Sequence, residues 1–405
     1  MTTTTTSIAE DLGRWAARLD PSAEDLALAR RSLLDTVAAT LAARDHPLRP
    51  VVAGLPDSAR WSALGHVLDF DDLHLESTAH ISVVCVPTAL ACRGGARAYL
   101  AGAGVMARLG TALGWGHYAR GWHATCTSGA AGAAVTAGVA LGLDGTQLAH
   151  AIALAVPASG GVQRAFGTPA KSLQVGFAAE AGVRAARLVA AGATADLRAV
   201  EQWLALVGGD PTALDLGGAA VPGGLAIKLF PCCYAMQRPI AAARELLAGG
   251  LTPAGVARLV VRTPEATLHP LIHHRPQTGL EGKFSLEYAV AATLLDGYPG
   301  FTSFSDDAVR RPEAQDLLRR VTVETTPDGE GLLTGTLALT AIGTDGAHRT
   351  ATVDLPPGSP LRPPTDGQLA EKAAACGCDL RELTWAAAAE LLAEHYPASG
   401  PAGVS

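Results

Sequence analysis

The chain has 405 residues, of which 48% are hydrophobic, and its mean hydropathy is positive, so general disorder is excluded and one large or two smaller domains are expected. The formal net charge of −7 and the pI of about 5.9 provide no basic surface for nucleic acid, because the arginines are scattered rather than clustered. The opening residues lack the pattern of a signal peptide, and no apolar run reaches the roughly 20 residues that span a bilayer, so we expect a cytoplasmic protein with no membrane contact.

The cysteines are expected to be reduced thiols in the core. They lack the CxxC spacing of a zinc or iron–sulfur site, and the HLESTAH segment at 74–80 lacks the i, i+4 histidine pair of a helical zinc site. We therefore expect neither a metal nor a cofactor. The cysteines are Cys85, Cys92, Cys126, Cys232, Cys233, Cys376 and Cys378.

The first clear helix is predicted to begin after Ser22. Ser22 and Asp25 form a start that resembles a capping box, and apolar residues recur at helical spacing from Leu26 to Leu41 until Pro47 ends the run. A connection rich in proline and glycine follows over residues 44–64.

The next stretch, HVLDFDDLHLESTAHISVVCVPTALAC at 66–92, is the first candidate site. Its carboxylates and imidazoles run directly into an apolar segment, where burial and neighbouring charges shift pKa values as acid/base chemistry requires. The alternative is the solvated acidic start of a helix with hydrogen-bonded histidines. We expect helix from this stretch to about Gly110. The titratable residues are His66, Asp69, Asp71, Asp72, His74, Glu76 and His80.

Two further breaks in the helical pattern carry ionisable groups. His123 follows Gly121 in a loop and lies at the start of a helix, where free backbone N–H groups attract anions, and small residues from Ala130 to Leu141 predict close helix packing. Helices are predicted over 146–164 and 172–192. Lys171 stands at the break between them, and it is either solvated or part of a site.

Lys228 lies inside the apolar run LAIKLFP, so its ammonium group must either extend to solvent or meet an anion. A helix is predicted over 237–248. Beyond Gly250 the pattern changes, and strands are predicted over 256–263, 321–326, 333–343 and 348–355. Helices are expected over 284–297, 306–319 and 367–396.

The predicted fold is therefore mostly α: a large all-helical domain and a smaller α+β lid domain with an antiparallel sheet. We assign residues 1–230 and 380–405 to the helical domain and residues 231–379 to the lid domain.

The chain resembles the MmgE/PrpD family, which includes 2-methylcitrate dehydratase, cis-aconitate decarboxylase and iminodisuccinate epimerase. The motifs that carry the resemblance fall in family order and span most of the chain. They are DFDDLHLESTAH at 69–80, GWHATCTSGAAGAA at 121–134, GLDGTQLAHAIALA at 142–155, GTPAKSLQVGFAAEAG at 167–182, KLFPCC at 228–233 and KFSLEYAVAATLLDG at 283–297.

The resemblance implies a homodimer with a pocket between the helical domain and the lid. The polar site positions of the family fall on Asp69, His80, His123, Lys171, Lys228 and Tyr288. We expect all of them except Lys228 to be catalytic, and Lys228 to bind substrate together with His74, Arg164 and Gln174. Arg164 is a candidate carboxylate clamp, with a surface arginine as the alternative.

Several positions depart from the family pattern. Leu73 stands where threonine is usual, Ile81 replaces a proline, and Gln174 and Gln237 stand where histidines are common. Each change removes a polar or cationic contact, so a typical tricarboxylate such as 2-methylcitrate is not the expected substrate.

The implied activity is that of a cofactor-independent lyase, a dehydratase or decarboxylase of a small polycarboxylate or hydroxy acid. Proton transfer next to a carboxylate requires cations near the developing charge and a base of tuned pKa. We expect His80, oriented or charge-balanced by Asp69, to act as the general acid or base, with Tyr288 or His123 as its partner on the opposite face. The alternatives are an isomerase or epimerase of a related carboxylate and a non-catalytic ligand-binding protein.

Overall fold

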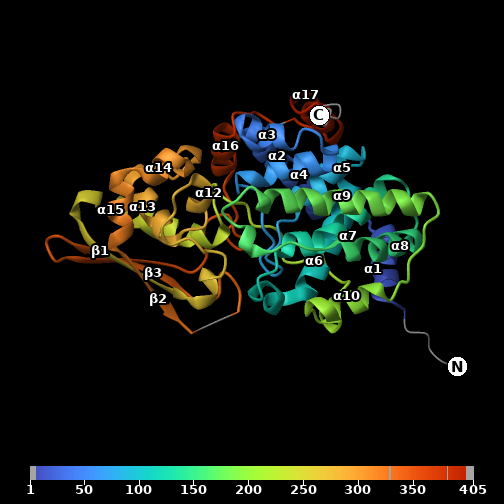
Figure 1. Ribbon diagram of the computed structural model, residues 1–405, viewed down its shortest axis with the longest axis horizontal. Coiled ribbons are helices and arrows are strands. Elements are labelled where there is room, and N and C mark those ends of the chain that lie inside the picture. Colours follow the sequence, from blue (N-terminus) through green and yellow to red (C-terminus); the bar gives the residue numbers. More distant parts are fainter. Residues whose placement is uncertain (1–5, 328–329, 381, 398–405) are drawn as a thin grey trace, which may run out of the picture.

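The structure is a computed structural model that describes residues 6–327, 330–380 and 382–397. It has a helical body and a smaller lobe with a β-sheet, which lie side by side along the long axis (Figure 1). The body holds the first ten helices, and the last two helices of the chain return to it beside α2 and α3. These helices are α1 (Ile8–Arg18), α2 (Ala23–Ala42), α3 (Leu48–Val51), α4 (Asp57–Val67), α5 (Ser82–Ala91), α6 (Ala96–Ala119), α7 (Ala124–Ala140), α8 (Gly145–Ala155), α9 (Ala170–Ala190), α10 (Ala199–Val207), α16 (Asp366–Ala375) and α17 (Trp385–His395).

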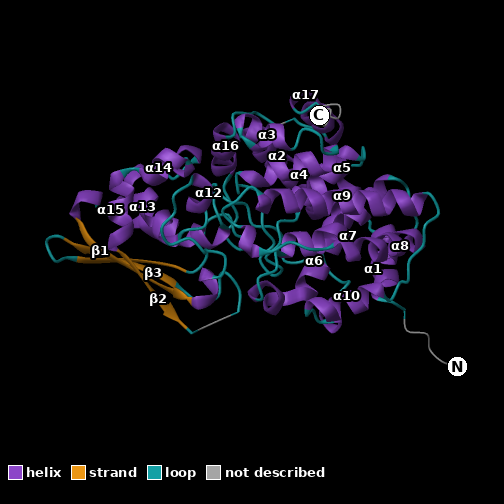
Figure 2. Cartoon of the chain, in the orientation of Figure 1, coloured by secondary structure: helices purple, strands orange, loops and turns teal. Residues whose placement is uncertain are grey.

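The smaller lobe contains a four-stranded sheet in the order β2-β1-β3-β4. Helices α11, α13 and α15 contact its strands, and the helices of this lobe lie on one side of the sheet (Figure 2). The fold class predicted from the sequence, a mostly α protein with a smaller α+β part, is confirmed. The elements are α11 (Gln237–Ala248), β1 (Val256–Pro264), α12 (Gly279–Gly282), α13 (Leu286–Asp296), α14 (Asp306–Arg310), α15 (Pro312–Arg320), β2 (Val321–Thr326), β3 (Leu337–Gly343) and β4 (His348–Val353).

The sheet differs from the prediction in one pairing. β3 pairs antiparallel with both β1 and β4, as expected, but β1 and β2 are parallel, with Leu259 opposite Val321. Parallel neighbours need a crossover of a dozen or more residues, and the chain between these strands is long enough to hold α12 to α15. The pattern within each strand gave no sign of this direction.

The acidic stretch is not the start of a helix, so that prediction was wrong. Residues 68–81 form turns and isolated bridges, and helix resumes only at Ser82. Asp69 and Thr78 both have positive φ angles, 55° and 56°, which a right-handed helix does not allow. The segment therefore crosses the body as an irregular loop between α4 and α5.

A contact of helix α16 with the body concerns the proposed domain boundary at residue 379. Helix α16 falls within the range assigned to the lid, but its Lys372 forms a 2.6 Å ion pair with Asp35 of α2 in the body. The ends of the proposed helical domain, residues 1–5 and 398–405, lie outside the described residues.

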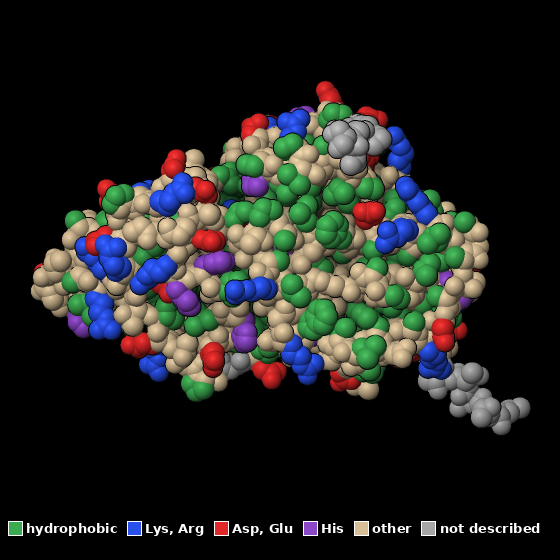
Figure 3. All heavy atoms as spheres, viewed as in Figure 1, with side chains coloured by type: hydrophobic (Ala, Val, Ile, Leu, Met, Phe, Trp, Pro, Cys, Tyr) green, Lys and Arg blue, Asp and Glu red, His purple; other side chains and the backbone are tan. Residues whose placement is uncertain are grey.

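Positive and negative side chains are interspersed over both lobes on the face seen in Figure 3. Among the described residues, every helix is either too short or too polar to cross a membrane.

Small residues bring α6, α7 and α9 into close contact, as predicted for the segment after Ala130. At Gly182 of α9, an added Cβ atom would lie 2.5 Å from the carbonyl oxygen of Ala130 and 2.5 Å from the backbone nitrogen of Ala134. Both neighbours are backbone atoms of α7 and cannot move aside alone, so only glycine fits this crossing.

We therefore expect Gly182→Ala to lower the free energy of unfolding by about 1–3 kcal/mol, the usual cost of overpacking. Gly116→Ala is the matched control, because an added Cβ atom there has no neighbour within 4 Å. It should leave stability unchanged or raise it by up to about 1 kcal/mol, since alanine favours helix more than glycine does. Urea unfolding of both variants measures the difference, and equal stabilities would show that the helix crossing is not tight.

Candidate active site

Three distant segments of the chain meet around the carboxylate of Asp69. Asp69 lies in the turn after α4, Lys171 is near the start of α9, and Lys228 lies in the loop before α11. The Lys228 Nζ atom is 2.5 Å and the Lys171 Nζ atom 3.3 Å from Asp69 Oδ1. All three side chains are buried, so Lys228 meets an anion rather than solvent.

The turn around Asp69 is held by lysines from three different parts of the chain. The ammonium group of Lys283 donates a hydrogen bond to the carbonyl oxygen of Leu68 at 2.7 Å. Lys228 donates to the next carbonyl, that of Asp69, at 3.0 Å, and Lys372 donates to that of Phe70 at 2.7 Å. Three successive carbonyls are therefore satisfied by buried cations, which fixes a turn that no regular ladder supports.

Asp71 rather than Asp69 lies against the rings of His66 and His80, so the predicted orientation of His80 by Asp69 was wrong, whereas Asp69 still interacts electrostatically with His80. Asp71 Oδ2 is 2.7 Å from His66 Nδ1 and 3.1 Å from His80 Nδ1. On its other side, His66 Nε2 accepts a hydrogen bond from the Lys171 ammonium group at 2.7 Å. The neutral ring of His66 must therefore carry its proton on Nδ1 and donate it to Asp71.

His123 is the N-cap residue of α7, as its place at a helix start predicted. Its buried ring stacks at 5.7 Å on that of His66 and packs edge-on against Phe166. The side-chain amide of Gln174 lies 2.7 Å from His123 Nδ1, whereas no described residue hydrogen-bonds His123 Nε2. The second nitrogen is thus left for a ligand.

Burial and charge shift the pKa values of these groups strongly. Burial alone would raise the pKa of Asp69, but Lys171 and Lys228 hold it below its usual range. Burial would likewise lower the pKa of Lys228, but Asp69 and Asp71 raise it above its usual range. Burial, together with Lys228, lowers the pKa of His80 to about 3. At neutral pH, Asp69 and Lys228 are charged and His80 is a neutral base.

The groups that face one another enclose a small cavity of about 20 Å³. That is room for about one water molecule, far below the roughly 300 Å³ at the lower end of ligand pockets. Its walls come from both lobes and are Asp69, Leu73, Thr78, His80, Tyr118, His123, Phe166, Lys171, Cys233, Tyr234, Phe284 and Leu332.

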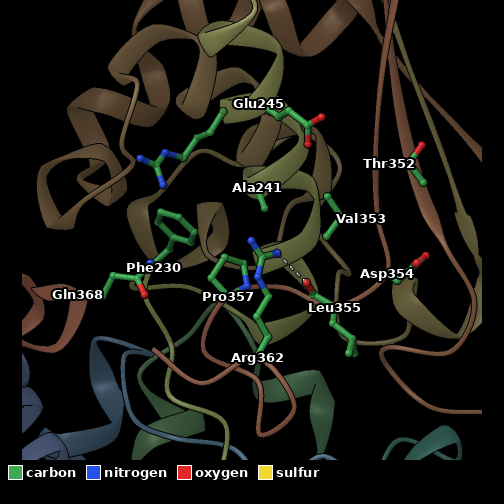
Figure 4. Close-up of a pocket in the computed structure, with 11 residues that line it drawn as sticks. Phe230, Ala241, Glu245, Thr352, Val353, Asp354, Leu355, Pro357, Arg362 and Gln368 are labelled. Atoms are coloured by element: carbon green, nitrogen blue, oxygen red, sulfur yellow. Dashed lines mark hydrogen bonds between the residues drawn. The ribbon is translucent and has the colours of Figure 1, made fainter. Parts of the chain in front are cut away.

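A larger cavity of about 520 Å³ lies elsewhere, between α11, β4 and the loop after β4 (Figure 4). Arg362 projects into it and donates a hydrogen bond to the carbonyl of Leu355, and Glu245 and Asp354 lie on its rim. Its charged side chains are exposed and of both signs. The smaller cavity is the better candidate, because paired buried charges with shifted pKa values mark functional sites more reliably than size does.

Five of the predicted site residues are brought together, namely Asp69, His80, His123, Lys171 and Lys228. Gln174 joins them through His123 rather than by lining the cavity.

Three predicted residues are not brought to the cavity. The Tyr288 hydroxyl group donates to the carbonyl of Ser303 inside the smaller lobe. His74 is hydrogen-bonded on both ring nitrogens, to Ser77 and to the carbonyl of Pro222, and so braces the loop. Arg164 is exposed.

The comparison with known proteins bears on this arrangement. The MmgE/PrpD N-terminal domain matches residues 55–206, and the MmgE/PrpD C-terminal domain matches residues 230–388. The chain belongs to the MmgE/PrpD family. The resemblance inferred from the motifs is therefore confirmed.

Relatives of this MmgE/PrpD protein include cis-aconitate decarboxylases. The protein of that name from Aspergillus terreus (strain NIH 2624 / FGSC A1156) is 26% identical over 388 residues, which cover 85% of this chain and 78% of that protein. The Homo sapiens protein is 27% identical over 233 residues, 51% of this chain and 46% of that protein. The Mus musculus protein is 30% identical over 226 residues, 51% of this chain and 45% of that protein.

The positions that depart from the MmgE/PrpD pattern have structural roles. Leu73 is buried and lines the cavity with an apolar side chain. Gln237 lies outside the cavity lining. Its side-chain oxygen accepts a hydrogen bond from the backbone N–H of Phe230, and its side-chain nitrogen donates to the backbone carbonyl of Phe230 at 3.0 Å. It thereby fixes the KLFPCC loop that presents Lys228.

Sequence reasoning missed His66, Asp71 and Lys283 as members of this site. His66 and Asp71 belonged to the acidic stretch, but nothing in the sequence separated them from its other titratable residues. Lys283 precedes the predicted helix of the KFSLEY motif, and burial lowers its pKa to about 8. A buried lysine at the start of an apolar segment was the available signal, as it was for Lys228.

His66, Asp71 and His80 also form a group whose donor atoms lie within 4.8 Å of one another, as in a metal site. Both Nδ1 atoms, however, approach the same oxygen of Asp71 directly, and the ammonium group of Lys171 occupies the far side of His66. Adjacent cations disfavour a shared metal ion, so this donor set fits a carboxylate that pairs with two imidazoles better than a metal site.

The buried histidines predict a pH dependence of stability. Each has a pKa lowered by burial, so below about pH 6.5 the unfolded chain binds more protons than the folded one, and stability is lost as the pH falls. Asp35 and Asp72 have the opposite effect on stability, because burial raises their pKa values and the folded chain then binds more protons as the pH falls. The pKa of Asp72 is raised to about 7. The histidines, which outnumber them, are His46, His66, His74, His80, His117 and His123.

We therefore expect the free energy of unfolding, measured with urea, to be smaller at pH 5 than at pH 7, by up to about 1.4 kcal/mol per pH unit for each dominant group. Equal or greater stability at pH 5 would contradict the buried neutral state of the histidines.

Proposed function

We propose that this protein is a cofactor-independent lyase that acts on a small polycarboxylate or hydroxy acid by proton transfer at a carbon next to a carboxylate. The observation that carries the proposal is the convergence of His80, His123, Lys171 and Asp69 on one buried cavity. The cis-aconitate decarboxylases among its relatives support loss of CO2 as the first reaction to test.

The charges around the cavity suit an anionic substrate. The ammonium groups of Lys171 and Lys228 pair with the carboxylate of Asp69, and that of Lys283 bonds the carbonyls of Leu68 and Pro231 nearby. Against the carboxylates of Asp69 and Asp71, these three cations leave one positive charge in excess. A cation held in a water-poor site stabilises the charge that develops on a substrate carboxylate when the adjacent carbon gains or loses a proton. Asp69 keeps the two nearest lysines in place before the substrate arrives.

His80 is the proposed proton carrier. Asp71 approaches its Nδ1 atom, which leaves Nε2 for the substrate and stabilises the ring when it becomes charged. The free ring is neutral at pH 7, as a base must be. A bound carboxylate would raise the pKa of His80, because an opposite charge favours the protonated form.

The cavity is too small for any such substrate, so its walls must separate on binding. Asp69, His80, His123 and Lys171 come from the body, whereas Phe284 belongs to the smaller lobe. We propose that the smaller lobe moves away to admit the substrate and closes to exclude water. A homodimer and a cytoplasmic location stay predictions.

His80→Ala should reduce turnover by about 10²–10⁴-fold, the usual contribution of positioned proton transfer, while the protein stays folded. The assay follows CO2 release or loss of water from cis-aconitate and a panel of di- and tricarboxylates by NMR. Tyr288→Phe is the control, because its hydroxyl group bonds Ser303 and not the cavity, and it should keep most of the activity. Wild-type turnover in His80→Ala, or a comparable loss in Tyr288→Phe, would assign the proton to another residue.

An epimerase is the second candidate, because two imidazoles, those of His80 and His123, line the same cavity. Reaction in D2O separates the two activities. An epimerase incorporates deuterium at the α-carbon of a product that has lost neither CO2 nor water, whereas a lyase forms a lighter product. The lyase assignment would be overturned if every active substrate gained deuterium at its α-carbon but lost neither CO2 nor water.

A further inference from the structure

The two ring nitrogens of His123 have different surroundings. Nδ1 faces the side-chain nitrogen of Gln174 at 2.7 Å and the thiol sulfur of Cys126 at 3.3 Å. Nε2 is buried and has no hydrogen-bond partner among the described residues. The ring borders the cavity of the candidate site, so this nitrogen is the one available to a ligand.

The orientation of the Gln174 amide is fixed by the backbone of Val162. The Gln174 oxygen accepts a hydrogen bond from the N–H of Val162 at 3.1 Å, and its nitrogen lies 3.3 Å from the carbonyl oxygen of Val162. The flipped amide would set two donors against each other and two acceptors against each other. The NH2 group must therefore face His123.

The protonation state of the ring follows from these partners. An NH2 group can only donate, so Nδ1 of His123 must be an acceptor, and the proton of the neutral ring lies on Nε2. Cys126 acts in the same direction, because burial raises the pKa of its thiol and keeps it an S–H donor. Burial and the charge of Lys171 hold the pKa of His123 well below its usual range, so the ring is neutral.

We propose that Gln174 is a positioning residue that holds His123 as the Nε2–H tautomer, so that this ring donates a hydrogen bond to the substrate and leaves proton transfer to His80. The catalytic part of this inference rests on the proposed function, whereas the tautomer does not. A buried N–H without a partner is costly, and a substrate carboxylate oxygen would satisfy it.

His66 provides an internal contrast. Its Nε2 accepts from Lys171, and its Nδ1 faces Asp71, so its neutral ring carries the opposite tautomer. The two stacked rings, 5.7 Å apart, therefore differ in which nitrogen bears the proton. A measurement that resolves both rings has a built-in reference.

The test is the NMR spectrum of the full chain labelled with ¹⁵N in its histidine rings, with signals assigned from His123→Gln and His66→Gln. The proton on Nε2 of His123 and on Nδ1 of His66 is the expected result in the wild-type protein. In Gln174→Glu, a carboxylate accepts from Nδ1–H, so the proton of His123 should move to Nδ1. Gln147→Glu is the matched control, because it adds the same charge at the exposed capping box of α8, where glutamate also fits.

A wild-type His123 with its proton on Nδ1 would overturn the inference, and so would an unchanged tautomer in Gln174→Glu. The wild-type spectrum decides the first point even if the variant does not fold. With an active substrate, Gln174→Glu should lower kcat by about 10²-fold, the effect of removing one preorganised donor, while Gln147→Glu keeps it. The expected tautomers without turnover of any carboxylate would contradict the proposed function alone.

Discussion

The structure depends on the burial of one carboxylate between two ammonium groups. A buried charge is stable only when opposite charges and hydrogen bonds surround it, and Asp69 has Lys228 at 2.5 Å and Lys171 at 3.3 Å. Asp69 also has a positive φ of 55°, a strained conformation for a residue other than glycine. The same lysines that neutralise the side chain are part of what holds its backbone, so the charge pair and the turn support each other.

This arrangement explains why the site draws on so much of the chain. The carbonyls of Leu68, Asp69 and Phe70 are held by lysines from the end of α12, from the loop before α11 and from α16. The smaller lobe and the helical body are thus tied together at the turn that carries the proposed catalytic groups. Movement of one lobe against the other would alter the distances around Asp69, so the proposed entry of substrate between the lobes would change the geometry of the site.

The parts of this site that depend on local chain properties could be predicted from the sequence, whereas the contacts between distant residues could not. Two features follow from local rules, namely free N–H groups at a helix N-terminus and the cost of a buried charge. They are the helix start at His123 and the choice of the Lys228 ammonium group between solvent and an anion. The lysine contacts to Leu68 and Phe70, in contrast, join residues 215 and 302 positions apart, which no local pattern encodes. The parallel pairing of β1 and β2 likewise depends on a long crossover.

Motif matches had a similar limit. They placed His80 and Tyr288 in one site, but only the ring of His80 lines the cavity, because the Tyr288 hydroxyl group bonds a carbonyl of its own lobe. The partner of His80 is Asp71 rather than Asp69, a difference of two positions that a sequence motif cannot resolve. A family motif predicts which residues lie near one another, whereas the loop conformation decides the direction in which each side chain points.

The most direct measurement is the melting temperature of the purified protein with a tricarboxylate, with its neutral trimethyl ester, and with no addition, for the wild-type chain and for Lys171→Met. The tricarboxylate is cis-aconitate, and di- and tricarboxylates of the assay panel are measured in the same way. If the lysines and histidines form one anion-binding site, at least one of these carboxylates raises the wild-type Tm, its neutral ester does not, and Lys171→Met abolishes the rise. A wild-type Tm that no carboxylate raises, or an equal rise in Lys171→Met, would contradict a shared anion site around Asp69.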